Sequence, residues 1–142
     1  MSKTILVPFD GSPESAAAVR HACERFADDD ILVLYVVEPF AEHTEAGIEG
    51  YEGTWLDSAE TYAEEMFTQA IDIADEYDVP IETAWQYGRP ERVIVEYITA
   101  HDIDQVVMGS RGRSGVPRVL LGSVAETTLR RSTAPVTIVR DV

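Results

Sequence analysis

Short apolar segments and longer amphipathic segments alternate along the whole of this 142-residue chain. The short segments are rich in β-branched residues, as buried strands are, and the longer ones repeat apolar residues every three or four positions, as helices do. This alternation predicts a mostly parallel sheet with helices on both faces, which is an α/β fold. We expect strands at Thr4–Pro8, Ile31–Val37, Val79–Gln86, Gln105–Met108 and Pro135–Val139, helices at Pro13–Ala27, Trp55–Tyr77, Gly88–Ala100 and Ser123–Arg131, and a surface loop at Glu38–Thr54.

Length and cysteine content bound how the chain is organised. A single domain over residues 1–142 is expected, because a chain of this size buries roughly 70% of its unfolded surface. Cys23 is the only cysteine, so an internal disulfide is excluded, and its place on the apolar face of the first helix favours core packing. His21, His43 and His101 lack the spacing of a zinc site. Without a signal-peptide pattern or an apolar run of about 18 residues, we expect a cytoplasmic protein that enters no membrane.

The net charge restricts the partners. Eleven basic residues against twenty-six acidic ones leave the chain at −15. A field of this sign repels nucleic acids and anionic membranes, so neither is an expected partner. Ten of the basic residues are arginines, and Arg over Lys on an acidic protein resembles the composition of halophilic proteins, in which salt screens the self-repulsion. An acidic cytosolic protein of ordinary salt tolerance is the alternative interpretation.

A glycine-rich segment after the fourth expected strand carries the clearest chemistry. Gly109, Gly112 and Gly122 follow the spacing G-x2-G-x9-G, and Ser123 comes next at the expected start of a helix. Glycines let backbone N–H groups form a concave anion site, and a helix N-terminus adds partial positive charge, so the segment suits a phosphate group. The charge of the segment agrees, because it holds three arginines and no acid: Arg111, Arg113 and Arg118.

A structural interpretation of the same residues stays open. Ser123 and Glu126 match the capping box S-x-x-E, and the glycines alone would also suit a flexible connection. Ligands of open parallel sheets bind beyond the carboxyl ends of the strands, which draws attention to Pro8–Asp10 and Val36–Glu38 as well. Asp10 has two interpretations here: a turn residue before Gly11, or a ligand-facing carboxylate that orients a metal ion.

Four segments together resemble the universal stress protein family, and in particular its ATP-binding branch. They are Ile5–Ser12 (ILVPFDGS), Leu34–Pro39 (LYVVEP), the Gly109 segment and Ala134–Arg140 (APVTIVR), so the resemblance covers nearly the whole chain. The resemblance implies one three-layer α/β/α domain with a five-stranded parallel sheet of order 3-2-1-4-5, the adenine nucleotide alpha hydrolase-like fold. It also implies a homodimer through the last strand, Pro135–Val139.

The resemblance also implies a nucleotide site, with ATP, or ADP or AMP, bound together with Mg or Mn held by phosphate oxygens. Phosphates would meet Gly112, Gly122, Ser123 and Val124, and the ribose would lie by Met108 and Gly109. Asp10 would reach the ribose or the metal, Val36 the adenine edge, and Pro8 and Phe9 would wall the base, although the family usually has a small residue at the position of Phe9. The charge pattern adds Arg111 and Arg113 to this nucleotide-binding set.

Three functions follow. The first is an ATP-binding stress-response or signalling module with little or no turnover, because the Walker lysine is absent and no catalytic base is evident. The second is a slow ATPase or self-phosphorylating protein that uses Ser110, Ser114 or Ser123 as phosphate acceptor. The third is a dimeric interaction module that binds no nucleotide.

Overall fold

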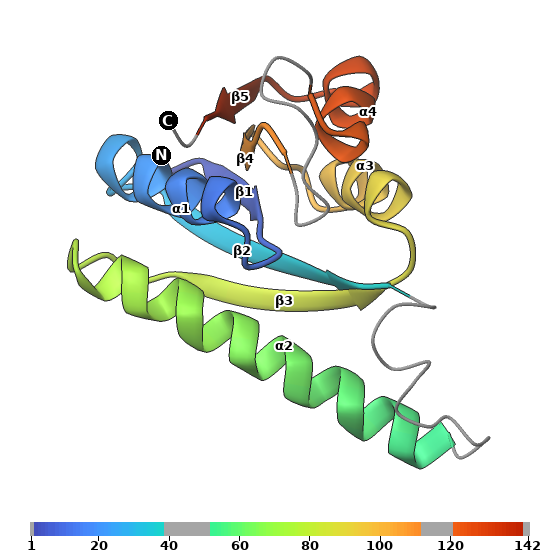
Figure 1. Ribbon diagram of the computed structural model, residues 1–142. Coiled ribbons are helices and arrows are strands. Elements are labelled where there is room, and N and C mark those ends of the chain that lie inside the picture. The colour runs from blue at the N-terminus through green and yellow to red at the C-terminus, as the bar shows by residue number, and fades with distance from the viewer. Residues whose placement is uncertain (1, 39–51, 112–120, 141–142) are drawn as a thin grey trace.

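The computed structural model describes residues 2–38, 52–111 and 121–140. Strands and helices alternate strictly along these residues, as the apolar pattern predicts (Figure 1). The elements are β1 (Thr4–Pro8), α1 (Pro13–Arg25), β2 (Asp30–Val37), α2 (Glu52–Asp75), β3 (Glu82–Tyr87), α3 (Pro90–Ala100), β4 (Gln105–Gly109), α4 (Ser123–Arg131) and β5 (Val136–Val139).

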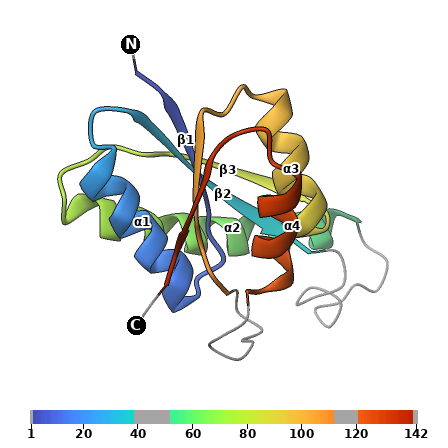
Figure 2. The same ribbon diagram turned by 90° about the horizontal axis from the view of Figure 1, so that it is seen from above.

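The five strands form one sheet in the order β3-β2-β1-β4-β5, and every neighbouring pair is parallel. Helices α1 and α2 cover one face of this sheet and α3 and α4 cover the other (Figure 2). The predicted α/β/α layers and the strand order 3-2-1-4-5 are therefore confirmed. Among the described helices, none is both long and apolar enough to cross a bilayer.

Alternating side chains of the central strands pack into cores on the two faces of the sheet. In β1, Ile5 and Val7 pack under α1 and α2, whereas Leu6 packs under α3 and α4, as the two-residue period of a strand requires. Cys23 is 2% exposed in the first core, which confirms its packing role. Burial also raises the pKa of the Cys23 thiol, so the reactive thiolate is disfavoured.

Several element boundaries differ by one or two residues from the sequence prediction, and the starts of β3 and α2 differ by three. The third strand begins at Glu82 rather than Val79, because Val79 donates its N–H to Ala74 O at the end of α2 and Pro80 has no N–H for the ladder. Val79 is nevertheless 7% exposed and belongs to the core, so the apolar signal was correct and its assignment to a strand was wrong. Helix α2 begins at Glu52, three residues earlier than expected, and ends at Asp75.

Candidate functional site

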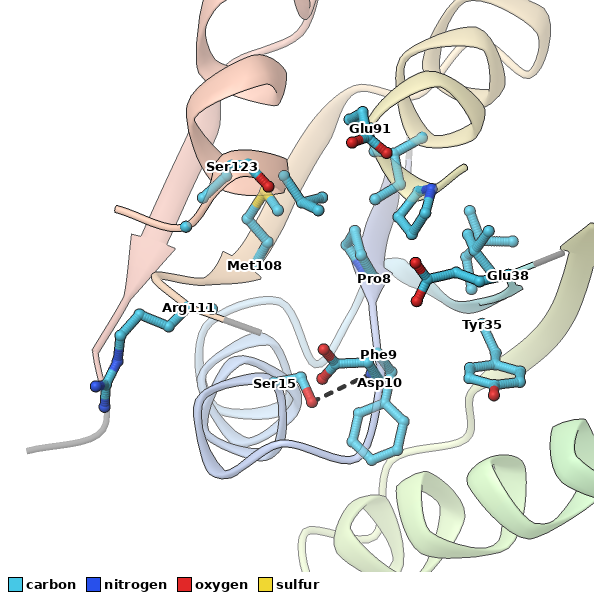
Figure 3. Close-up of a pocket in the computed structure, with 18 residues that line it drawn as sticks. Pro8, Phe9, Asp10, Ser15, Tyr35, Glu38, Glu91, Met108, Arg111 and Ser123 are labelled. Atoms are coloured by element: carbon cyan, nitrogen blue, oxygen red, sulfur yellow. Dashed lines mark hydrogen bonds between the residues drawn. The ribbon is translucent and has the colours of Figure 1, made fainter. Parts of the chain in front are cut away.

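A cavity of about 260 Å³ opens where the strand order reverses, at the carboxyl ends of β1, β2 and β4 (Figure 3). This is the place at which open parallel sheets bind their ligands. Ten residues predicted from the sequence line it together: Pro8, Phe9, Asp10, Val36, Met108, Gly109, Arg111, Gly122, Ser123 and Val124. The predicted residues Gly112 and Arg113 lie outside the described residues.

The ring of Phe9 does not lie where it could pack against a base in the cavity. Its side chain is 3% exposed and belongs to the core under α1 and α2. Figure 3 shows the ring directed toward α2 and away from the cavity. The cause is the strand period, because Phe9 continues the alternation of Ile5 and Val7 onto that face. Pro8, one position earlier, has the opposite orientation and stands at the cavity.

The turn between β1 and α1 is held by hydrogen bonds among neighbouring residues. Asp10 Oδ1 accepts from the N–H of Ser12 at 3.0 Å, and the Asp10 N–H donates to Ser15 Oγ at 3.3 Å. Ser12 caps α1 by accepting from the N–H of Ser15 at 3.1 Å, and Pro13 occupies the first helical turn. Asp10 is thus a turn residue, and its carboxylate also lines the cavity (Figure 3). The two interpretations of Asp10 are geometrically compatible.

The start of α4 differs from the predicted capping box. Gly122 is the N-cap, with φ −68° and ψ 161°, and no side chain caps the helix, so Ser123 is its first helical residue. The capping-box interpretation of Ser123 was wrong, and its exposed hydroxyl stands at the cavity instead. Gly122 donates its N–H to Ser110 O at 2.8 Å, and this bond joins the start of α4 to the residue that follows β4. Ser123 and Val124, whose amides have no partner within the helix, both line the cavity.

Arg111 is paired with a residue that the sequence did not single out. Its guanidinium binds the carboxylate of Glu14, which lies in the first turn of α1 and is 5% exposed. Next to this pair, a Cβ added to Gly109 would stand 2.7 Å from the backbone carbonyl carbon of Glu14. Gly109 thus lets α1 approach β4 closely. This role differs from the one that its motif predicts, in which the glycine exposes backbone N–H groups to a ligand. Glu14 and Arg111 are 97 positions apart in the sequence, so no local pattern could predict their contact.

The comparisons with known proteins agree with this architecture. The sequence pattern of the universal stress protein family matches residues 1–140.

The chain belongs to the universal stress protein family.

A universal stress protein of Methanocaldococcus jannaschii is 34% identical over 145 residues, which cover 97% of this chain and 82% of the relative. Among solved structures, the universal stress protein UspA of Lactobacillus plantarum is 28% identical and superposes with a TM-score of 0.78 over 97% of each chain. Another universal stress protein, crystallised in complex with cAMP, is 26% identical with a TM-score of 0.76 over 99% of this chain and 98% of that one.

The cavity of this universal stress protein has a second wall that the sequence motif does not include. It is built from the end of β2 and the start of α3: Leu34, Tyr35, Glu38, Pro90, Glu91 and Ile94. The sequence indicates only that Glu38 follows a strand, and the α3 residues carry no motif. Across the described lining residues, Asp10, Glu38 and Glu91 contribute carboxylates and Arg111 contributes the only basic side chain. Within the part of the chain that the structure describes, no group of three or more His, Cys, Asp or Glu side chains is arranged to hold a metal ion by itself.

Proposed function

We propose that this universal stress protein binds an adenine nucleotide in the cavity and acts as a stress-response or signalling module with little or no turnover. The observation that carries the proposal is the junction of β4 and α4. There the first amides of α4 and the exposed Ser123 hydroxyl face a cavity that also receives the ends of β1 and β2. A helix N-terminus opening on a cavity is a favourable seat for a phosphate group.

Two further observations support this function. The related universal stress protein crystallised with cAMP shares the fold of this chain over almost its entire length. The described lining residues also include no lysine or histidine that would stabilise a transferring phosphoryl group or relay a proton. On this proposal the base lies toward Val36 and Pro8, the ribose lies toward Asp10, Met108 and Gly109, and the phosphates lie at Ser123 and Val124. Mg or Mn would be held by phosphate oxygens, with Asp10 nearby.

Asp10→Asn tests the site without breaking the turn. Asparagine keeps an oxygen that accepts the Ser12 N–H, but it removes the charge that would act on a ribose or a metal ion. We expect stability to change little and the Kd for ATP with Mg to rise about tenfold, since a hydrogen bond to a charged group contributes roughly 1.5–3 kcal/mol. Isothermal titration calorimetry with ATP, AMP and cAMP measures this.

The matched control is Asp102→Asn. Asp102 is an exposed residue that precedes β4, at the opposite end of the sheet from the cavity, and its φ of 51° suits asparagine. It loses the same charge and should bind nucleotide as the wild type does. Gly122→Val places a branched side chain at the cavity and should abolish binding. If the wild-type protein binds none of the three nucleotides even at high salt, the proposed function is wrong.

Turnover and assembly are measured on the same protein. Steady release of ADP above that of Gly122→Val would favour the ATPase alternative. Mass spectrometry of nucleotide released on denaturation would identify the ligand.

The assembly is argued from β5, which is the edge strand of the sheet next to β4. An edge strand is a surface on which a second chain can pair. We therefore propose a homodimer through Pro135–Val139, for which sedimentation equilibrium should give twice the chain mass of 15.7 kDa.

A further inference from the structure

One of the two acidic residues of α3 lies on the face that this helix turns toward the sheet. Ile94 and Ile98 of that face are both 2% exposed in the core under α3 and α4. Glu91 precedes Ile94 by three positions, so it continues the same face toward the start of the helix. Glu91 is half-buried and lines the cavity together with Ile94. The apolar stripe of α3 therefore ends in a carboxylate at the point where the core meets the cavity.

Glu91 lies near the proposed seat of the phosphates. Helices α3 and α4 pack against each other, and Ser123 begins α4 at the same cavity (Figure 2). Figure 3 shows Glu91 and Ser123 on one side of the cavity and Asp10 on the other. Neither α3 nor α4 has a side-chain cap at its N-terminus, whereas α1 is capped by Ser12. Two helix starts thus border the cavity on this side, and Glu91 adds a negative charge there.

Helix stability alone does not explain the inward placement of this charge. A carboxylate anywhere in the first turn of α3 would stabilise the helix N-terminus, including one that points into solvent. Among the residues that the structure describes, none forms an ion pair with the Glu91 carboxylate. A charge that is partly shielded from water and not neutralised by a described partner acts on whatever enters the cavity.

We propose that Glu91 is a specificity-determining residue whose charge limits how much the cavity gains from each additional phosphate of a bound nucleotide. The inference deepens the proposed function and rests on it, because it concerns phosphates bound at Ser123 and Val124. Like charges brought together in a binding site oppose association. The penalty is absent for adenosine, grows from AMP to ATP, and decreases when Mg neutralises part of the triphosphate.

Glu91→Gln tests the proposal, because glutamine keeps the size of the side chain and removes its charge. We expect the affinity for adenosine to stay within about twofold, that for AMP to rise about threefold and that for metal-free ATP to rise about tenfold, as the removal of a like-charge contact predicts. The gain for ATP should be smaller with Mg. It should also shrink in 1 M salt, where charges interact over only about 3 Å in solvent. Isothermal titration calorimetry measures each affinity.

The matched control is Glu96→Gln on the same helix. Glu96 is exposed and does not line the cavity, so this variant loses the same charge from the protein as a whole and should bind all three ligands within about twofold of the wild type. Glu91→Ala is the second test variant and should give the same gain for ATP as Glu91→Gln, since only the charge matters. Thermal unfolding without ligand verifies that each variant is folded.

Three results would overturn the proposal. If Glu91→Gln weakens adenosine and ATP alike, the carboxylate accepts a hydrogen bond from the ligand or supports the cavity wall. If Glu96→Gln raises the affinity for ATP as much as Glu91→Gln does, the effect belongs to the net charge of −15 and not to position 91. If Glu91→Gln gains affinity and Glu91→Ala does not, the glutamine amide has formed a new contact with the phosphates.

Inorganic tripolyphosphate separates this proposal from the proposed function. A wild-type protein that binds neither ATP nor adenosine contradicts nucleotide binding. Tighter binding of tripolyphosphate by Glu91→Gln than by the wild type supports the role of Glu91 even then, because that ligand has no base or ribose. Equal binding by the two proteins, or binding by neither, would overturn the role of Glu91.

Discussion

Two connections meet at the cavity, and they are held in place by different kinds of contact. The turn from β1 to α1 is held by hydrogen bonds within six residues, from Asp10 to Ser15. The described ends of the connection from β4 to α4 are held by residues far away in the sequence. Ser110 donates its N–H to Val139 O in β5, and Arg111 binds Glu14 in α1. The bond from the Gly122 N–H to Ser110 O joins the two described ends of this second connection.

The difference shows how one cavity combines two kinds of stability. A turn closed by its own side chains forms once its residues are present in the right order. The described ends of the anchored connection take their positions from contacts with α1 and β5. Substitutions in the first connection should therefore cost a single local interaction, whereas those in the second should disturb packing between elements.

The largest effect is expected for Gly109→Ala. The new Cβ would lie 2.7 Å from the carbonyl carbon and from Cβ of Glu14, and a helix backbone cannot yield as a flexible side chain can. We expect a loss of about 3 kcal/mol in the free energy of unfolding, at the upper end for an overpacked site. Urea denaturation followed by circular dichroism measures this. A loss below about 1 kcal/mol would mean that the second connection is not held by the close approach of α1.

A smaller effect is expected for Gly11→Ala in the first connection. Gly11 has φ +83°, which costs an alanine about 1–2 kcal/mol, and its nearest contact is the flexible Met66 side chain, whose Sδ would be 3.0 Å from the new Cβ. Gly11→Asn is the matched control, since asparagine accepts positive φ more readily and should recover part of the loss. If Gly11→Ala proves as costly as Gly109→Ala, the contrast between a local turn and a packed junction fails.

The smallest effects distinguish the two helix starts. Ser12→Ala removes a side-chain cap from α1 and should cost about 1 kcal/mol of unfolding free energy. Ser123→Ala removes a hydroxyl that caps nothing and should change stability by less than about 0.5 kcal/mol. Thermal unfolding of the two variants without ligand gives both values. Equal losses would show that Ser123 supports α4 after all.

Much of the cavity could be predicted from residues next to one another. The Ser12–Pro13 helix start, the apolar strands and the glycine spacing are local signals, and the strand order came from the resemblance of four segments to one family. Three features escaped: the orientation of the Phe9 ring, the N-cap at Gly122 in place of Ser123, and the ion pair of Arg111 with Glu14. The first was readable from the strand period of β1, whereas the other two depend on how the ends of β4 and α4 are anchored. The halophilic character inferred from the charge of −15 stays a prediction.

The order of residues along the chain was sufficient to predict the alternating elements, the apolar faces that form the core and the carboxyl end of the sheet, where the cavity opens. Hydrophobic periodicity and turn-forming residues act over a few positions, so a short stretch of sequence is enough to reveal them. The packing of distant elements was needed to bring Glu14 against Gly109 and Arg111 and to direct the Arg111 charge away from the cavity. Contacts of that kind arise from the placement of α1 on β4, a distance of 97 residues along the chain, over which no local pattern extends.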